Sequence, residues 1–579
     1  MVKINKTLGL ALLTALAASC SSDNDVAQSN NPVIENGDVA YATLRIDLPT
    51  QQGSRATTFA DGLASEYKVN DATLLVFKKG SATSEGAYTF LQSVDLGTLT
   101  PTAVGYNGIT TQAEVTAKLD KASLTDAKKG EYYGLVILNN KKKDGSVKIN
   151  VPTTTVTYSA WNVADNVIAA NMTDVDNGIV MANAPEWTTS GQAPLTLVAI
   201  DGTKVQPTEA QAKAAGTAAT IHVERGLAKV TMATVEKAKE TPTGTAFASD
   251  NVTISKWGLD VTNTKSYPVH NVDGLATDYS AIWTESTSAT TATTVNRFHD
   301  MTNTFKRVFW GKDPNYSLGA DYITGADAVN KCEKEFNMVK DATKLSDKFS
   351  TDNANPNNPQ YCLENTFDIN NMTQGQTTRV LIQATYAPSG ITSGTTFFRL
   401  GNKMYIQKDL EAYINNVVKL VAGKTSGTDY TLSLGDIATK AGSHELSADN
   451  FKKTEGTDNA DLGDGMLDKV KAQLNGKIQT YVNGVCYYIG RIKHFNAETP
   501  WNAGDATYGT GDDANLKYLG RYGVLRNNWY QLSVNSITGP GEPDIPTVVP
   551  ENPDDESNVY VDLSVKILQW AVRSQGLDL

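Results

Sequence analysis

Histidines and carboxylates are the residues of this sequence whose side chains could catalyse a reaction or bind a metal. The histidine spacings match no metal-binding or catalytic-triad motif. The five histidines are His222, His270, His299, His444 and His494. Asp458, Asp461 and Asp464 lie among glycines, but they lack the alternating ligand spacing of a calcium loop. We therefore expect no catalytic residues, no metal site and no cofactor. A surface glycosidase stays open as a third hypothesis, since paired carboxylates for glycoside hydrolysis leave no fixed spacing.

Cys20 indicates a different chemistry, the attachment of a lipid. Lys3 and Lys6 precede the apolar run 8–18, which suits a signal peptide and is too short for a stable transmembrane helix. The small residues 17–19 resemble the cleavage box of bacterial lipoproteins, in which the cysteine becomes the lipidated first residue. A plain signal peptide with an incidental cysteine is the alternative. The acidic stretch 21–25 resembles the surface-export signal of lipoproteins from Bacteroidales.

Arg55 suggests a third chemistry, hydrolysis of the chain itself. It follows Gly53 and Ser54 in a short polar link, where a protease could reach it. An exposed arginine in a loop is common. Its significance therefore depends on the elements that lie on either side of it.

Two segments at opposite ends of the chain share an alternating pattern that is typical of a β-strand with one buried face. The apolar residues of the first are Ala40, Ala42, Leu44, Ile46 and Leu48, and those of the second are Val559, Val561, Leu563, Val565 and Ile567. The second pattern then changes phase, with Leu568, Trp570 and Val572 apolar, so we expect a bend or a second short strand after Ile567. A front strand that fills a groove and a similar tail strand suggest subunits that polymerise when the tail strand of one enters the groove of another. The alternative is that both are ordinary edge strands of one domain.

The length and charge of the chain limit its organisation and its partners. At 579 residues it is too long for one core of usual size. A net charge of -12 without a long basic run argues against nucleic acid as a partner. We expect a lipoprotein signal peptide (1–19), a propeptide with the front strand (20–55), two β-rich domains (56–220 and 221–538) and a tail (539–579). Short strand-like runs separated by turn residues indicate β-sandwiches.

Several further segments predict individual strands, helices and loops. Residues 69–77 and 132–138 read as core strands, and 112–129 as a surface helix or a long loop. Helices are expected at 208–215, at 466–474 and at 410–421, the last with Asp409 as a possible cap and an apolar face that packs on a sheet. Residues 284–305 read as a surface insertion, and the Pro-rich residues 539–558 as an extended spacer that carries the tail strand to a neighbour. Three further cysteines, Cys332, Cys362 and Cys486, favour buried free thiols, with a bridge between the first two as the alternative.

Four tracts carry a resemblance to a known family. They are Tyr361–Phe367, Gln376–Val380, Gly484–Tyr488 and Tyr522–Tyr530. They resemble the minor-fimbrillin branch of the fimbrillins, the pilins of type V pili of Bacteroidales. The resemblance implies an all-β-dominated fold of two transthyretin-like β-sandwich domains, with short helical insertions and a C-terminal donor strand. It also implies lipidation at Cys20, cleavage of the bond between Arg55 and Ala56 by an Arg-specific surface protease, and removal of the strand Ala40–Leu48.

The function that this resemblance implies is structural. The residues Val559–Leu579, with Leu568 and Trp570 among them, would be the donor segment that enters the emptied groove of another subunit. The family's tip subunits tend to lack such a tail, so its presence favours a shaft subunit. Implied partners are other copies, tip or anchor subunits, the protease, and the outer membrane through the lipid before maturation. The implied location is a surface fimbria for adhesion or biofilm formation. A glycan-binding surface lipoprotein, which would need neither Arg55 nor the tail, is the alternative.

Overall fold

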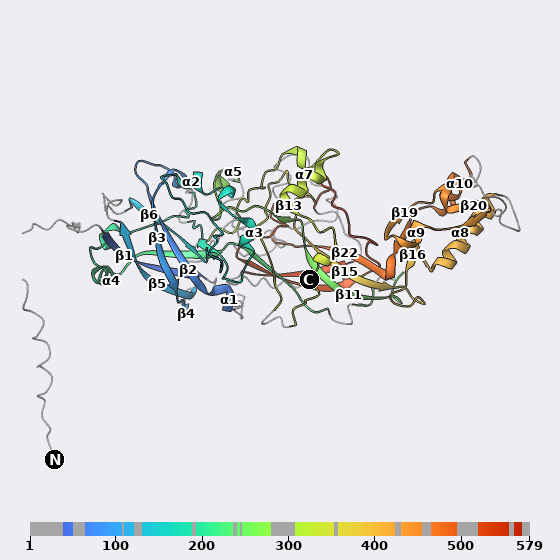
Figure 1. Cartoon of the computed structure of the whole chain (residues 1–579), viewed down its shortest axis with the longest axis horizontal. Coiled ribbons are helices and arrows are strands. Elements are labelled where there is room, and N and C mark those ends of the chain that lie inside the picture. Colours follow the sequence, from blue (N-terminus) through green and yellow to red (C-terminus); the bar gives the residue numbers. More distant parts are fainter. Residues whose placement is uncertain are drawn as a thin grey trace, which may run out of the picture.

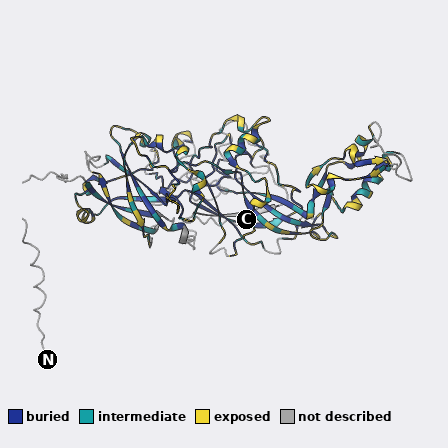
Figure 2. Cartoon of the chain, viewed as in Figure 1, coloured by how far each residue is buried: buried dark blue, intermediate teal, exposed yellow. Residues whose placement is uncertain are grey.

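The computed structural model is an elongated molecule built mainly from β-sheets (Figure 1). It describes residues 39–49, 64–106, 109–120, 130–187, 193–235, 240–243, 246–279, 307–351, 357–422, 430–453, 465–494, 519–554 and 561–569. Strands predominate and short helices lie between them, so the prediction of an all-β-dominated fold is confirmed. Buried residues follow the sheets, whereas exposed residues lie on outer helices and loops (Figure 2).

The N-terminal part is a β-sandwich whose two halves are joined through one strand. Its strands are β1 (Val39–Pro49), β2 (Val69–Lys78), β3 (Thr89–Leu99), β4 (Thr102–Tyr106), β5 (Ile109–Asp120), β6 (Tyr132–Leu138), β7 (Met181–Asn183), β8 (Val198–Ala199) and β9 (Thr217–Arg225). Their order is β3-β2-β6-β7-β9-β1-β5-β4, with β8 paired to β6. The core strands predicted at 69–77 and 132–138 are confirmed as β2 and β6.

The prediction of a helix or loop at 112–129 is wrong as far as Asp120, because these residues form most of β5. Ala113, Ala117 and Leu119 are buried on one face and alternate with polar residues. Alanine favours helices, so its use on the apolar face of a strand concealed the period of two. Residues 121–129 lie outside the described part.

Short helices connect the strands of this part. They are α1 (Ala64–Tyr67), α2 (Tyr158–Trp161), α3 (Ala169–Met172) and α4 (Glu209–Ala215). The helix predicted at 208–215 is confirmed as α4. Thr208 begins it as the N-cap, since its side-chain oxygen accepts a hydrogen bond from the backbone N–H of Gln211 at 3.3 Å.

The C-terminal part has a second sandwich. The strands of this part are β10 (Ala228–Met232), β11 (Asn251–Asp260), β12 (Thr262–Asn263), β13 (Phe336–Asn337), β14 (Gln360–Cys362), β15 (Arg379–Ala387), β22 (Val485–Arg491), β23 (Asn528–Ile537) and β24 (Val561–Gln569), of which β12 and β13 form a separate two-stranded sheet. The sheets β14-β10-β23-β24 and β11-β15-β22 share a core that contains Val230, Ile382, Tyr488 and Leu532. Because β9 pairs in the first sandwich and β10 in the second, the chain passes between them after Arg225. The helices α5 (Leu275–Asp278) and α7 (Ala328–Glu335) lie in this part.

A lobe at one end of the molecule contains the longest described helix (Figure 1). Its elements are β16 (Phe397–Leu400), β17 (Lys403–Tyr405), α8 (Gln407–Val421), β18 (Tyr430–Leu432), α9 (Asp436–Thr439), β19 (Gly442–His444), β20 (Phe451–Lys453), α10 (Met466–Leu474) and β21 (Ile478–Tyr481). Leu410 and Ile414 of α8 share a core with Phe398 of β16, so the predicted helix packs on a sheet as expected. Helix α8 begins at Gln407 rather than behind an Asp409 cap, and α10 confirms the second predicted helix. The lobe itself was not predicted, because its small core is assembled from strands of three or four residues.

Short 3-10 helices complete the described elements. They are η1 (Glu85–Ala87), η3 (Ala164–Asn166), η4 (Gly202–Lys204), η6 (Ala320–Tyr322), η7 (Ala342–Lys344), η8 (Ala448–Asn450) and η9 (Val482–Gly484).

The cysteines in the described part are buried free thiols, so the alternative of a bridge between Cys332 and Cys362 is not realised. Burial raises the pKa of the Cys362 and Cys486 thiols to about 12, which leaves them protonated and unreactive at neutral pH. None of the described helices is long and apolar enough to cross a membrane. The described residues also contain no group of three potential metal ligands.

Candidate functional site

The front strand β1 lies in the middle of the N-terminal sheet. It pairs antiparallel with β5 from Val39 onward and parallel with β9 from Thr43 to Asp47. The interpretation of both predicted strands as edge strands is therefore wrong for β1. A central strand that is removed leaves two neighbours with unpaired backbone groups, one on each side of the gap.

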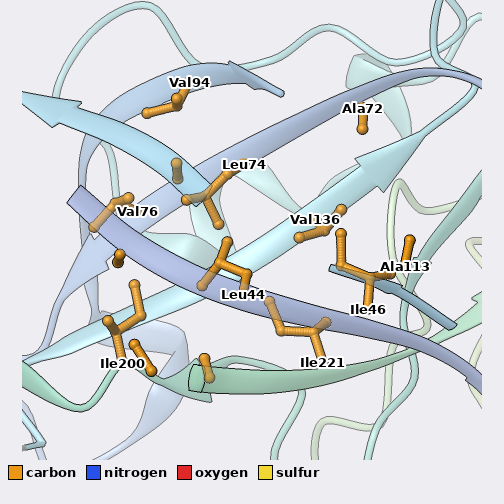
Figure 3. Close-up of a cluster of buried hydrophobic side chains, with 14 of the residues drawn as sticks. Leu44, Ile46, Ala72, Leu74, Val76, Val94, Ala113, Val136, Ile200 and Ile221 are labelled. Carbon is orange, nitrogen blue, oxygen red and sulfur yellow. The ribbon is translucent and has the colours of Figure 1, made fainter. Parts of the chain in front are cut away.

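The side chains of β1 fill the interior of the sandwich. Ala40, Ala42 and Leu44 are fully buried, and Ile46 is 4% exposed. Figure 3 shows Leu44 and Ile46 among side chains of several other strands of the sandwich. Loss of β1 would therefore open an apolar groove. The side chain of Leu48 is not described, and Cys20, Arg55 and Ala56 lie outside the described residues.

The other face of β1 is buried at two of its positions. Thr43 is 1% exposed, and its hydroxyl lies 3.2 Å from the hydroxyl of Thr116. Asp47 is fully buried and accepts hydrogen bonds from the Gln112 side chain at 2.9 Å and from Arg45 at 3.2 Å. The sequence predicted only that these residues face away from the core. It gave no signal that Thr43 and Asp47 are buried and contact side chains of the neighbouring strand β5.

A histidine on β9 connects the Asp47 position to a second carboxylate. His222 Nε2 lies 3.9 Å from Asp47 Oδ2, and His222 Nδ1 lies 2.7 Å from Glu186 Oε1. Asp47 thus contacts both neighbouring strands of β1, through Gln112 on β5 and His222 on β9. The groove would lose this carboxylate together with β1.

The tail strand β24 occupies an edge of the C-terminal sheet. It pairs antiparallel with β23 and has no partner on its other side within the described sheet. The pairing of β24 with β23 is regular from Leu563 to Gln569, so the bend predicted directly after Ile567 is not found in the described part. A register shift lies instead between Asp562 and Leu563, opposite Val534 to Ser536. Val559, Trp570 and Val572 lie outside the described residues.

The Pro-rich segment before β24 is packed against the C-terminal domain. The backbones of Glu542 and Tyr487 exchange two hydrogen bonds of 2.8 Å. The carbonyl oxygen of Pro546 accepts a hydrogen bond from Arg379 at 2.7 Å, and that of Asp554 accepts one from Arg491 at 2.7 Å. The prediction of a free spacer is therefore wrong for residues 539–554.

The composition of that segment predicted an extended spacer and could not reveal the arginines that bind it. Asp554 is bound to the domain and β24 begins at Val561, so residues 555–560 link these two points. Such a stretch spans at most about 20 Å.

Helix α1, at the other end of the link that contains Arg55, is fixed by a buried ion pair. Glu66 lies 2.7 Å from Lys229 Nζ and accepts a hydrogen bond from the Tyr361 hydroxyl at 2.6 Å. Lys229 Nζ lies 3.9 Å from the centre of the Trp529 ring. Burial lowers the pKa of Lys229, and the neighbouring carboxylate partly opposes this shift. Because Lys229, Tyr361 and Trp529 belong to β10, β14 and β23, Glu66 joins the two sandwiches.

We predict that Glu66→Ala lowers the free energy of unfolding by about 3–5 kcal/mol, because it leaves the Lys229 charge buried without its carboxylate. Chemical denaturation of the purified chain measures this loss. The matched control is the double variant Glu66→Ala with Lys229→Met, which removes both charges and should recover most of the stability. Equal losses in the single and double variants would show that the charge pair is not the source of the stability.

The C-terminal part of the chain is similar to a known protein family. Residues 479–576 match the family model described as "Major fimbrial subunit protein type IV, Fimbrillin, C-terminal". This part of the chain is similar to the C-terminal region of fimbrillins. The matched region includes β22, β23, the packed Pro-rich segment and β24. The match supports the predicted fimbrillin family and does not separate its minor from its major branch.

Two solved structures resemble the chain at low identity. One is a candidate cell adhesion protein from Parabacteroides distasonis ATCC 8503, with 12% identity, a TM-score of 0.35, and coverage of 93% of this chain and 99% of that one. The other is a fimbrial assembly protein from the same organism, with 12% identity, a TM-score of 0.19, and coverage of 47% of this chain and 78% of that one. No curated protein matches the sequence significantly.

Proposed function

We propose that this chain is a structural fimbrial subunit that polymerises by strand exchange. Strand β1 is cut away, and the tail strand of another copy takes its place. The observation that carries the proposal is the position of β1, a buried strand paired on both sides. The matched region, which contains β24, supports the assignment to a fimbria.

The pairing of the two strands gives the exchange a driving force. Among the described strands of its own chain the tail strand has one hydrogen-bonded neighbour, whereas the emptied groove offers two, β5 and β9. Each fully buried aliphatic side chain contributes about 1.5–3 kcal/mol. The five aliphatic residues from Val559 to Ile567 would thus contribute on the order of 10 kcal/mol before ordering costs. Transfer of the tail strand from the edge of its own sheet to the groove of another copy therefore favours polymerisation.

The maturation steps belong to the same proposal. The precursor is lipidated at Cys20 and exported to the outer surface of the outer membrane. An Arg-specific protease then cuts between Arg55 and Ala56 and releases the segment that contains β1. The mature subunit joins other copies, and tip or anchor subunits, in a surface fimbria for adhesion or biofilm formation, and it has no catalytic role.

The anchored Pro-rich segment adds a geometric condition to this assembly. The start of the donor strand can lie at most about 20 Å from Asp554 unless residues 539–554 are released from the domain. Consecutive subunits must therefore lie close together, with the groove of one near the anchored Asp554 of the next.

The experiment that tests the proposal replaces Arg55. We expect Arg55→Ala to leave the precursor uncut and monomeric on the cell surface, because β1 then stays in its groove. Arg55→Lys is the matched control: it should behave like Arg55→Ala if the protease accepts only arginine. Blotting of surface fractions for stable multimers measures the result. Normal multimers of uncut Arg55→Ala would overturn protease-triggered exchange.

A further inference from the structure

We infer that the tail strand of a second copy enters the groove in the same direction and register as β1. This inference rests on the strand exchange proposed above and adds the orientation of the incoming strand. The paired positions are Ala40 with Val559, Tyr41 with Tyr560, Ala42 with Val561, Thr43 with Asp562, Leu44 with Leu563, Arg45 with Ser564, Ile46 with Val565, Asp47 with Lys566 and Leu48 with Ile567. The central leucine coincides in either direction. The residues on either side of Leu563 therefore decide the direction of the incoming strand.

The core face favours the same direction through its volumes. Ala40 and Ala42 are fully buried, so the groove is narrow where they lie. In the same direction these positions receive two valines, whereas the reverse direction places the larger Ile567 at Ala40. Overpacking of a filled core costs about 1–3 kcal/mol, so the smaller additions are preferred. The same direction also places Ile567 at Leu48, a residue of equal size.

The Asp47 position favours the same direction through its charges. The groups that face it from the neighbouring strands are Gln112 on β5 and His222 on β9, with Glu186 hydrogen-bonded to His222. Removal of β1 takes away Asp47 and its partner Arg45 together, and the Glu186 carboxylate stays. The same direction brings Lys566 to this site, where its ammonium group is attracted to that carboxylate. The reverse direction would bring the uncharged Tyr560.

The Tyr41 position agrees with this orientation. Tyr41 exchanges two backbone hydrogen bonds of 2.8 Å with Gln206 at the start of β1, and its side chain is half-buried. The same direction replaces this tyrosine with Tyr560. The Thr43 position alone favours the reverse, since Ser564 would replace a hydroxyl by a hydroxyl. In the same direction Asp562 occupies it, and the Thr116 hydroxyl can donate to the Asp562 carboxylate.

Disulfide trapping between two separately purified mature variants tests the orientation. Asp47 lies directly opposite Gln112 in the register of β1 and β5. A Gln112→Cys chain mixed with a Lys566→Cys chain should therefore form linked dimers on oxidation. A mixture of Gln112→Cys with Tyr560→Cys should form about tenfold fewer, because a disulfide requires Cα atoms within about 7 Å. The native cysteines of the described part are buried, which limits background linkage.

Each outcome decides a different question. Dimers linked through positions 112 and 566 support the orientation. Dimers linked through 112 and 560 overturn it in favour of the reverse direction. Multimers that form without either linkage overturn the register and leave strand exchange in place. If the unmodified mature chain forms no multimers, the proposed function itself fails.

A charge exchange provides a second measurement that does not depend on disulfide geometry. Lys566→Glu should slow assembly, because it places a carboxylate beside Glu186. Glu186→Lys in the receiving subunit should then restore the rate at least in part. If the paired variants assemble no faster than Lys566→Glu with the unmodified groove, Lys566 does not occupy the Asp47 position.

Discussion

Leu563→Asp is expected to abolish polymerisation while the monomer stays folded. In the register inferred above, Leu563 takes the position of Leu44, which is fully buried. A carboxylate there would lose its hydration without a counter-charge, at a cost of several kcal/mol. In the monomer, the same residue lies on a strand that has one partner among the described strands, so we expect the domain to keep its fold when this strand is perturbed. Electron microscopy of fibres and thermal unfolding of the monomer measure the two effects.

The matched control for Leu563→Asp is Ser564→Asp, which introduces the same charge on the opposite face of the strand. In the orientation inferred above, Ser564 takes the place of Arg45, whose side chain is 34% exposed. This variant should assemble almost normally. Fibres of normal length and number from Leu563→Asp would show that this segment is not the donor.

Leu44→Ala is expected to destabilise the precursor and to leave the finished fibre unchanged. Truncation of a fully buried leucine costs about 2–5 kcal/mol, so the N-terminal domain of the uncut chain should unfold at a lower denaturant concentration. Because the proposed cleavage removes β1 before assembly, the stability of the fibre should not change. Weaker retention of β1 should also speed assembly after cleavage. Denaturation of the precursor and of isolated fibres measures the contrast.

Leu74→Ala is the matched control, since Leu74 belongs to β2 of the same core and stays in the mature subunit (Figure 3). It is also fully buried. This variant should weaken the precursor and the fibre alike. If Leu44→Ala weakened the fibre as much as Leu74→Ala does, β1 would have to be present in the assembled subunit.

The sequence predicted those parts of the fold in which local pattern and tertiary environment agree. Strands β2 and β6, which are compact apolar runs, and helices α4, α8 and α10 were expected close to their observed bounds. Strand β5 was missed because Ala113 and Ala117, which favour helices, form part of its buried face. The pattern of β1 predicted a one-sided strand, but the burial of Thr43 and Asp47 depends on contacts with distant segments.

The candidate site was predictable in its parts and not in its connections. The alternating residues of β1 and β24 were visible in the sequence, yet no local pattern could show that one strand is central and the other lies at an edge. The Pro-rich segment has the composition of a spacer, and it is held by Arg379 and Arg491 from remote parts of the chain. Glu66 and Lys229 meet across the two sandwiches, so their spacing in the sequence carried no signal.

The most direct test of strand exchange is the N-terminus of the protein recovered from the cell surface, determined by intact mass and terminal sequencing. We predict that the subunits of stable multimers begin at Ala56 and therefore lack β1. Multimers whose subunits retain residues 39–49 would contradict the proposal, because the groove would still be filled by the chain's own strand. A lipidated start at Cys20 in monomeric material would instead favour a surface lipoprotein that binds glycans.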